Sequence, residues 1–304
     1  MKIGVISNAE YCVPLLQLLK SNHITASVFS DAALFDKYGA ITYFCKGTLM
    51  PHKVGSENDL YVWLKSEKFD MVFMMGYAHL IDINLVSQTL SQHFYNIHFG
   101  DLPGFRGPQP VFWQIKLGTS HLTTTIHRVN ARFDDGGIVW QKKIERSAHH
   151  SYGMAHLILG QVSLEGVVFL ISCFIQKKEV LEQKQDKSKG RYYQRPQLKD
   201  IQIDWENMTA QEIVNLVRAC NPWNKGASTF FQGNEIKIID AESYSTPYEE
   251  VGISPGSIVN AGQTLEIFCI DGKLLSVYML NINGVFYPAR YSDLMGIVVE
   301  QRFI

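Results

Sequence analysis

The sequence predicts a two-domain protein: a doubly wound, mostly parallel α/β sheet followed by a small β-barrel. The chain opens strand–helix–strand, and its first strands are apolar throughout, as buried parallel strands are. Beyond residue 226 the pattern changes to short strands separated by turn residues, which is typical of an all-β domain. With 304 residues, 46% of them hydrophobic, the chain is long enough to bury a core in both domains.

The first domain is predicted to alternate strands and helices. Ser7-Asn8 is expected to cap a first helix through Val13 to Leu19, and residues 30–56 are expected to be irregular. The first strand-to-helix turn, Ser-Asn-Ala-Glu, lacks the glycine pattern of dinucleotide sites, so no dinucleotide cofactor is expected. The predicted strands are Lys2–Ser7, Ala26–Phe29, Asp70–Met75, a strand ending at Asn96 and His98, Thr123–Val129 and Ile138–Gln141. The other predicted helices are Glu57–Lys68, Asn84–Gln92, Pro110–Leu117 and Tyr152–Gln176.

Residues 177–199 carry eight Lys or Arg against three acids, which indicates a solvated linker between the domains. The alternative is that Arg191 or Arg195 meets a substrate phosphate. We expect a catalytic domain at 1–180, a linker at 181–200 and a second domain at 201–304. The second domain begins with a helix capped at Thr209 by a capping-box pattern. Its predicted strands are Ala227–Phe231, Glu235–Asp240, Gly256–Val259, Thr264–Cys269 and Leu274–Leu280.

The bulk composition excludes several classes of function. A formal net charge of −1 gives no global basic field of the kind that gathers nucleic acid. The five cysteines are scattered, odd in number and never in C-x-x-C spacing, so buried thiols are expected and no metal site. The start lacks the long apolar core of a signal peptide, and the apolar stretch Gly166–Ile175 is too short to span a bilayer. We expect a cytoplasmic protein with no membrane partner.

Three polar residues between Phe94 and Gly137 are chemically matched. Asn96 and His98 are two apart at the end of an apolar-aromatic strand, so they share one face of it. Asp134 follows the strand Thr123–Val129 and precedes Gly136 and Gly137. An amide, an imidazole and a carboxylate at strand ends can polarise a carbonyl and stabilise an oxyanion, and the carboxylate can orient the imidazole. We therefore predict Asn96, His98 and Asp134 to be catalytic.

Three motifs together resemble the folate-dependent formyltransferases. They are Asn96-Ile97-His98, the loop Leu102-Pro103-Gly104-Phe105-Arg106-Gly107, and Asp134-Asp135-Gly136-Gly137-Ile138. The resemblance covers nearly the whole chain, because the last third is similar to the second domain of the methionyl-tRNA formyltransferase group. It implies a Rossmann-like catalytic domain, an open barrel of the oligonucleotide/oligosaccharide-binding type, and transfer of a formyl group from N10-formyltetrahydrofolate to an amine. No metal is implied.

The resemblance also implies where the two substrates bind. The pterin of the folate would lie on the backbone of two loops, one after the third buried strand and one around Asp134. The corresponding cofactor-binding residues are Met75, Gly76, Tyr77, His79, Leu80, Ile81, Arg132, Phe133 and Asp135. The glycine- and proline-rich loop after His98 would face the acceptor. Its predicted substrate-binding residues are Gly100, Asp101, Phe105, Arg106, Gly107 and Pro108.

The sequence leaves several alternatives for the acceptor amine. The tRNA enzymes carry a long basic loop after their second strand, whereas residues 30–40 here hold a single lysine and two aspartates. A loop meant for a phosphate-rich acceptor stem would be basic. Ile126-His127-Arg128-Val129 is more similar to the sugar-nucleotide formyltransferases, so we expect a small amine, first of all a nucleotide-linked amino sugar. The alternatives are initiator methionyl-tRNA, a hydroxylated amino acid such as hydroxyornithine, and a non-catalytic folate- or RNA-binding module. A homodimer is compatible with the sequence.

Overall fold

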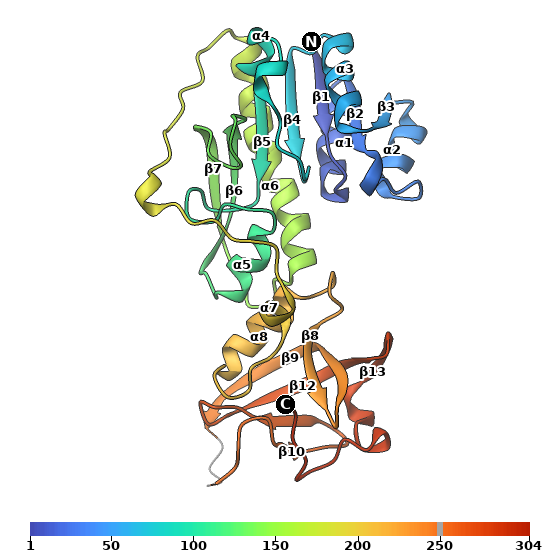
Figure 1. Ribbon diagram of the computed structural model, residues 1–304, viewed down its shortest axis with the longest axis vertical. Helices are drawn as coiled ribbons and strands as arrows, with labels where there is room; N and C mark the ends of the chain where they lie inside the picture. The colour runs from blue at the N-terminus through green and yellow to red at the C-terminus, as the bar shows by residue number, and fades with distance from the viewer. Residues whose placement is uncertain (248–251) are drawn as a thin grey trace. The chain divides into compact units, whose positions relative to one another are not determined.

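The computed structural model describes residues 1–247 and 252–304, and it divides into two compact units (Figure 1). The first, which we call the catalytic unit, comprises Met1–Pro110, His121–Glu145 and His156–Gln194. The second, the C-terminal unit, comprises Val111–Ser120, Arg146–Ala155 and Arg195–Ile304. All five cysteines are free and buried, as expected of structural thiols.

The catalytic unit is built on a seven-stranded sheet of order β3-β2-β1-β4-β5-β6-β7 (Figure 1). The first five strands pair in parallel, whereas β6 and β7 run antiparallel to their neighbours. The chain order reverses between β1 and β4, and in open α/β sheets ligands bind at the carboxyl ends of the strands near such a reversal. The predicted doubly wound sheet is confirmed. Its strands are β1 (Lys2–Ile6), β2 (Thr25–Asp31), β3 (His52–Gly55), β4 (Met71–Met75), β5 (Phe94–His98), β6 (His121–Arg128) and β7 (Ile138–Glu145).

Most predicted helices of the first 176 residues are present. The helices are α1 (Val13–Ser21), α2 (Ala40–Thr48), α3 (Glu57–Glu67), α4 (Gln88–Ser91), α5 (Pro110–Lys116) and α6 (Tyr152–Ile175). Short 3-10 turns occur at Glu10–Cys12, Ala32–Leu34 and Ile83–Leu85. The helix predicted over Asn84–Gln92 is wrong in extent: only α4 forms, with Ser87 as its cap.

Residues 30–56 are not irregular, which corrects the prediction. They form α2 and the edge strand β3, and α2 buries Ile41, Thr42 and Cys45. The helix is short and mixes aromatic and β-branched residues, so its periodicity is weak in the sequence. The expected Ser7-Asn8 cap is also wrong. Asn8 instead makes two hydrogen bonds of 3.0 Å with the backbone N–H and carbonyl of Asp31, and so ties β1 to β2.

The stretch predicted to be too short for a bilayer belongs to a longer apolar helix. By length and composition α6, with 24 residues and an 18-residue stretch of mean hydropathy 2.0, resembles a membrane span, which corrects the estimate from Gly166–Ile175 alone. It packs against the sheet, because a Cβ at Gly166 would meet Ile126 of β6 and Trp140 of β7. Its buried residues include Leu159, Val167 and Leu170. A core helix passes the same composition test, so α6 is not evidence for a membrane.

The C-terminal unit carries an antiparallel sheet of order β10-β11-β12-β9-β8, with β13 on β12 (Figure 1). The sheet is curled, as predicted for an open barrel. Helix α8 (Ala210–Ala219) begins at Thr209 with both bonds of the capping box, which confirms that prediction. The strands are β8 (Ala227–Phe231), β9 (Asn234–Pro247), β10 (Ile258–Asn260), β11 (Leu265–Phe268), β12 (Lys273–Ile282) and β13 (Val285–Pro288). The last was not predicted, and the remaining short helices are Lys187–Lys189, α7 (Leu198–Ile201), Ala289–Tyr291 and Asp293–Met295.

Candidate active site

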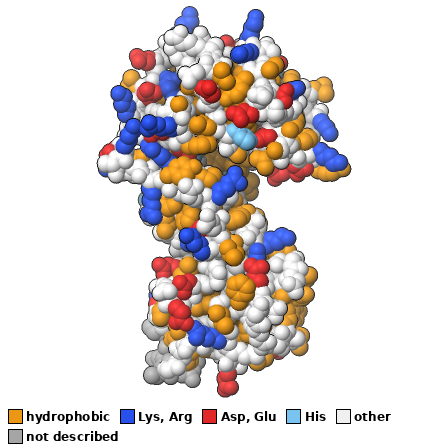
Figure 2. Space-filling view, in the orientation of Figure 1, with side chains coloured by type: hydrophobic (Ala, Val, Ile, Leu, Met, Phe, Trp, Pro, Cys, Tyr) orange, Lys and Arg blue, Asp and Glu red, His pale blue; other side chains and the backbone are white. Residues whose placement is uncertain are grey.

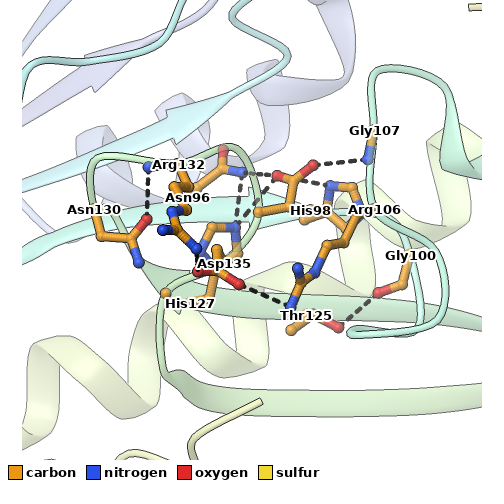
Figure 3. Close-up of polar contacts among 12 residues, drawn as sticks. Asn96, His98, Gly100, Arg106, Gly107, Thr125, His127, Asn130, Arg132 and Asp135 are labelled. Atoms are coloured by element: carbon orange, nitrogen blue, oxygen red, sulfur yellow. Dashed lines mark hydrogen bonds and ion pairs between the residues drawn. The ribbon is translucent and has the colours of Figure 1, made fainter. Parts of the chain in front are cut away.

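The three predicted catalytic side chains meet at the carboxyl end of β5, where Figure 3 shows Asn96 and His98. Asn96 Nδ2 lies 3.3 Å from Asp134 Oδ1, and His98 Nδ1 lies 3.4 Å from the same oxygen. Asp134 comes from the turn between β6 and β7, which runs beside β5 because β5 and β6 are paired. The two-residue spacing thus places Asn96 and His98 on one face of β5, opposite one carboxylate.

The backbone holds the Asp134 carboxylate in place. Asp134 has a left-handed φ of 51°, a conformation in which short polar residues are enriched. The backbone N–H of Gly107 donates to Asp134 Oδ2 at 2.9 Å. Residue 107 must be glycine, because its φ is 112° and a Cβ there would overlap the carbonyl of Tyr193. The glycine-rich loop is therefore a support for the carboxylate.

The charges of His98 and Asp134 follow from burial and from each other. Burial alone would raise the pKa of Asp134, but His98, His127 and the Gly107 N–H hold that pKa well below its usual range. Burial lowers the pKa of His98, although Asp134 opposes the shift. At neutral pH the site therefore pairs a carboxylate with a neutral imidazole.

The hydrogen bonds of His98 define its tautomer. His98 Nε2 lies 2.6 Å from the carbonyl oxygen of Phe105, and since a carbonyl only accepts, Nε2 carries the proton. Nδ1 then faces Asp134 with a lone pair, at a distance longer than a good hydrogen bond. A proton on Nδ1 would be stabilised by the carboxylate, so Asp134 favours His98 as a proton acceptor.

His127 is a fourth member of this cluster, and it is not among the site residues predicted from the sequence. Its Nδ1 lies 2.8 Å from the Arg128 carbonyl, which makes Nδ1 the donor, and its Nε2 lies 3.1 Å from Asn96 Nδ2. His127 Nε2 thus accepts one amide hydrogen of Asn96 while Asp134 Oδ1 accepts the other, and the same Nε2 lies 3.5 Å from that oxygen. Its pairing with Asn96 across β5 and β6 was the signal that could have revealed it.

The six residues predicted to bind the acceptor differ in what their side chains and backbone contact. Besides its backbone contact with His98, Phe105 stacks on Tyr193 with ring centroids 5.3 Å apart. Gly100 accepts a 2.7 Å hydrogen bond from Thr125, and a Cβ there would collide with His98. Asp101 is paired with Lys143 at 2.7 Å, away from the cluster's hydrogen bonds, while Pro108 is exposed. Arg106 is turned to Asp135, at 2.9 Å, and to Gln185.

The predicted folate loop after β4 is only partly exposed. Met75 and Ile81 are buried, whereas Gly76 and Leu80 are exposed. Tyr77 packs on the core cluster around Ile81, and its hydroxyl is buried without a hydrogen-bond partner. His79 Nε2 lies 2.5 Å from Asp31 Oδ2. The structure therefore places His79 beside the carboxyl end of β2.

The predicted folate residues beside Asp134 line an open pocket. Arg132 and Phe133 are exposed, and Asp135 pairs with Arg106. Among the residues that the structure describes, no group of three His, Cys, Asp or Glu side chains could hold a metal ion.

Part of the predicted linker lies on the catalytic unit. Ile138 and Gln183 exchange backbone hydrogen bonds, and Gln185 Nε2 donates to the carbonyls of Asp134 and Gly136 at 2.9 and 2.8 Å. Gln185 therefore holds the turn that carries the Asp134 carboxylate, a role that composition alone did not reveal. Arg191 lies over the Tyr193 ring at 4.6 Å.

The arrangement can stabilise charge on a carbonyl and move a proton. Asn96 supplies amide N–H groups, His98 a basic nitrogen and Asp134 a buried negative charge. In this structure these groups are hydrogen-bonded to each other and to Phe105, and such contacts commonly rearrange when reactants bind. The site suits acyl-type transfer through a tetrahedral oxyanion.

The chain belongs to the formyl transferase family. The model "Formyl transferase" matches residues 2–155, and "Formyl transferase, C-terminal domain" matches residues 197–284. This confirms the resemblance drawn from the three motifs. Two similar curated proteins are both named methionyl-tRNA formyltransferase. That of Alkaliphilus oremlandii is 26% identical over 99% of this chain and 98% of its own, and that of Clostridium beijerinckii is 28% identical over 90% of each.

Similar solved structures share the fold at low identity. WlaRD, a sugar 3N-formyltransferase solved with dTDP and 5-N-formyl-THF, is 18% identical and gives a TM-score of 0.71 over 91% of this chain and 97% of its own. An N-formyltransferase of Helicobacter canadensis, solved with folinic acid and dTDP-3-aminofucose, is 16% identical, with a TM-score of 0.69 over 91% and 98%. HypX of Aquifex aeolicus, solved with tetrahydrofolic acid, gives 0.67 at 17% identity over 97% of this chain and 47% of HypX.

Proposed function

We propose that this protein transfers a formyl group from N10-formyltetrahydrofolate to the amine of a small acceptor, most specifically a nucleotide-linked amino sugar. The observation that carries the small acceptor is the charge of the C-terminal unit. The main segment of that unit, Arg195–Ile304, has eight Lys or Arg against 13 Asp or Glu. Phosphate-rich RNA is bound by basic surfaces, so this unit is poorly suited to hold a tRNA.

The C-terminal sheet adds to that argument. Glu242 of β9 and Tyr278 of β12 are hydrogen-bonded on its exposed surface, and Glu266 of β11 bonds Ser276 of β12. Single-stranded nucleic acids bind barrels through aromatic platforms within a basic groove. Here the exposed Tyr278 is hydrogen-bonded to the carboxylate of Glu242, and the neighbouring strand carries Glu266, so this part of the surface is acidic and not basic.

The segment after β2 also lacks a tRNA loop. It forms the 3-10 turn Ala32–Leu34 and leads directly to α2, and its one base, Lys37, lies over Tyr38. Asp31 N-caps the turn through the backbone N–H of Ala33. A short, folded, acidic connection offers little to an RNA phosphate backbone.

The reaction follows from the residues of the cluster. The acceptor amine attacks the formyl carbon, a tetrahedral oxyanion forms, and the bond to N10 of the folate then breaks. Asn96 donates to the oxyanion by redirecting the N–H that lies 3.3 Å from Asp134, the longer of its two contacts. The amine loses one proton and N10 gains one, and the His98–Asp134 pair is placed to carry it.

A folate donor is supported by the relatives rather than by a bound molecule. WlaRD, the Helicobacter canadensis enzyme and HypX were each solved with a folate compound. The loops predicted to hold the pterin, Met75–Ile81 and Arg132–Asp135, lie at the carboxyl ends of β4 and β6. We place the protein in the cytoplasm, where its five free thiols would remain reduced.

Methionyl-tRNA formyltransferase is the second candidate. It is favoured by the curated relatives of that name, which match over nearly the entire chain. Their 26–28% identity leaves the acceptor undecided, because acceptor-contacting loops diverge faster than a shared catalytic core.

The test is a panel of acceptors with one donor. The purified protein is incubated with N10-formyltetrahydrofolate, and tetrahydrofolate release is followed with dTDP- and UDP-amino sugars, N5-hydroxyornithine, initiator methionyl-tRNA or water. His98→Ala serves as the blank. We expect His98-dependent turnover with an amino sugar nucleotide, whereas turnover with methionyl-tRNA alone would overturn the proposal.

A further inference from the structure

An open pocket of about 230 Å³ lies beside the catalytic cluster, in the catalytic unit. It is walled by the turn Arg132–Asp135, by Arg106, and by residues from 187 to 192. Asp135 directly follows the catalytic carboxylate, and Arg106 directly precedes the glycine whose N–H bonds it. The mechanism uses none of the pocket's side chains, so their function needs another explanation.

The lining of this pocket has an excess of positive charge. It contains Arg106, Arg132, Lys187 and Arg191 but only one carboxylate, Asp135. Asp135 forms an ion pair with Arg106 at 2.9 Å, and its Oδ2 lies 4.0 Å from Arg132 Nη1. Lys187 and Arg191 have exposed side chains, and Lys and Arg gather on the flank of the catalytic unit where Figure 1 draws residues near 187 in yellow (Figure 2). The pocket is thus prepared for a ligand with more than one negative charge.

The volume of the pocket and its aromatic side chains further restrict the class of ligand that fits. Pockets that hold an entire small ligand usually measure about 300–1,000 Å³, so this pocket suits one end of a ligand. Phe133 and Tyr192 are 45% and 47% exposed and offer apolar surface next to the cations. A flat ring followed by carboxylates matches this lining.

We propose that the pocket, and above all Arg132, Lys187 and Arg191, binds the glutamate tail of the folate donor. This inference rests on the proposed folate chemistry. In N10-formyltetrahydrofolate the formyl-bearing nitrogen is attached to a benzoyl ring, and the glutamate carboxylates follow that ring. The lining suits this order, because Phe133 and Asp135 flank Asp134 in the chain and the same pocket also holds the cations Lys187 and Arg191. Each further γ-linked glutamate adds a carboxylate that can reach another exposed cation.

The acceptor's diphosphate fits the same residues less well. A diphosphate is a compact group whose charges are best held by buried, hydrogen-bonded donors. The least exposed cation of the pocket, Arg106, is already paired with Asp135 and bonded to Gln185. The three exposed cations interact weakly one at a time, because solvent screens them, and they favour a chain of spaced charges.

The experiment compares donors with one and five glutamates. Isothermal titration of the full-length protein with tetrahydrofolate mono- and pentaglutamate gives Kd values that do not depend on turnover. We expect the pentaglutamate to bind about tenfold more tightly at low salt, from a few weak pairs together. Lys187→Glu/Arg191→Glu should reduce that ratio to about one, and Lys46→Glu/Lys65→Glu, two exposed lysines of α2 and α3, should leave it unchanged.

The outcomes separate this inference from the proposed function. Equal Kd values for both folates in the wild type, or an unchanged ratio in the 187/191 variant, would overturn the tail site even if formyl transfer proceeds. A rise in the KM of the acceptor alone in that variant would assign the pocket to the acceptor. If the wild type turned over no acceptor but still bound the pentaglutamate more tightly than the monoglutamate, the proposed reaction would be overturned and the tail site would stand.

Discussion

Two carboxylate–imidazole pairs stand at the carboxyl edge of the same sheet, and their surroundings differ. His79 and Asp31 are 2.5 Å apart, but the His79 side chain is 44% exposed. His98 and Asp134 are 3.4 Å apart, and the His98 side chain is 6% exposed. The shorter contact is therefore that of His79 and Asp31, the pair with fewer hydrogen-bond partners. The comparison teaches that burial and convergence of several polar groups identify the reactive site better than one short distance does.

The network around each pair explains this difference. Asp134 accepts hydrogen bonds from Asn96 and the Gly107 N–H, its Oδ1 lies 3.4 Å from His98 Nδ1, and its backbone carbonyl is held by Gln185. Within the described residues, the Asp31 carboxylate contacts the Ala33 N–H and His79, and Asn8 holds the Asp31 backbone. We therefore expect substitutions at the first pair to change the reaction, and substitutions at the second pair to leave it nearly intact.

The largest effect is expected from Asp134→Asn. The substitution keeps the side-chain volume and removes the charge that stabilises protonated His98. We expect kcat to fall by about 10³-fold, within the range for loss of general acid–base help. Single-turnover formyl transfer measures it, and circular dichroism controls for the fold. A kcat within tenfold of the wild type would remove Asp134 from the catalytic cluster.

Asn96→Ala should have the next largest effect. It removes the amide that we assign to the oxyanion, a donor typically worth about 10²–10³ in kcat. The KM of the folate should change little, because the interaction is made mainly in the transition state. Steady-state kinetics at saturating acceptor tests this. If kcat were unchanged and the KM of the folate rose by a factor of about 10²–10³ instead, Asn96 would be a binding residue.

His127→Ala should be milder, because His127 acts through Asn96. We expect about a tenfold loss of kcat, and partial recovery in His127→Gln, whose amide oxygen can accept the same N–H. The wild type, the two single variants and Asn96→Ala/His127→Ala form a double-mutant cycle. Additive losses would show that the two residues act independently.

The pH dependence of stability should also single out the buried pair. The pKa of Asp134 is lowered by folding, so the unfolded state binds more protons near and below pH 4, and stability falls as the pH drops through that window. The pKa of His98 is lowered too, so stability rises with pH up to the ordinary histidine value of 6.5. Urea unfolding of wild type and Asp134→Asn from pH 3 to 7 measures the difference. Parallel curves would contradict the assigned charges.

The smallest effect is expected from Asp31→Asn. The amide can keep the contacts with Ala33 and His79, and a partly exposed pair is worth at most about 1 kcal/mol. We expect kcat to remain within about fivefold of the wild type, measured in the same assay. A loss as large as that of Asp134→Asn would mean that the second pair belongs to the catalytic machinery.

Long, strongly patterned elements were predictable from the sequence. The buried strands β1 and β4 and the helices α3, α6 and α8 carry clear apolar patterns or caps. Helix α2 and strand β13 were missed because they are short, and tertiary packing rather than local pattern stabilises them.

For the site, the sequence predicted the residues that we propose to carry the chemistry better than the residues that hold them in place. Asn96, His98 and Asp134 were found through strand spacing and motifs, and the structure brings them together. His127 was undervalued because its contact with Asn96 depends on the register of β5 and β6. Gln185 was hidden because a charged, aliphatic-poor segment gives no sign that it returns to the Asp134 turn.

The most direct test of the central claim is a competition for a limiting donor. Wild-type protein receives N10-formyltetrahydrofolate together with equal concentrations of a dTDP-amino sugar and initiator methionyl-tRNA. The ratio of formylated products then gives the ratio of the two kcat/KM values, because both acceptors share one pool of enzyme. Our account predicts that the formyl group is found mainly on the sugar nucleotide. Formyl groups found mainly on methionyl-tRNA would contradict it.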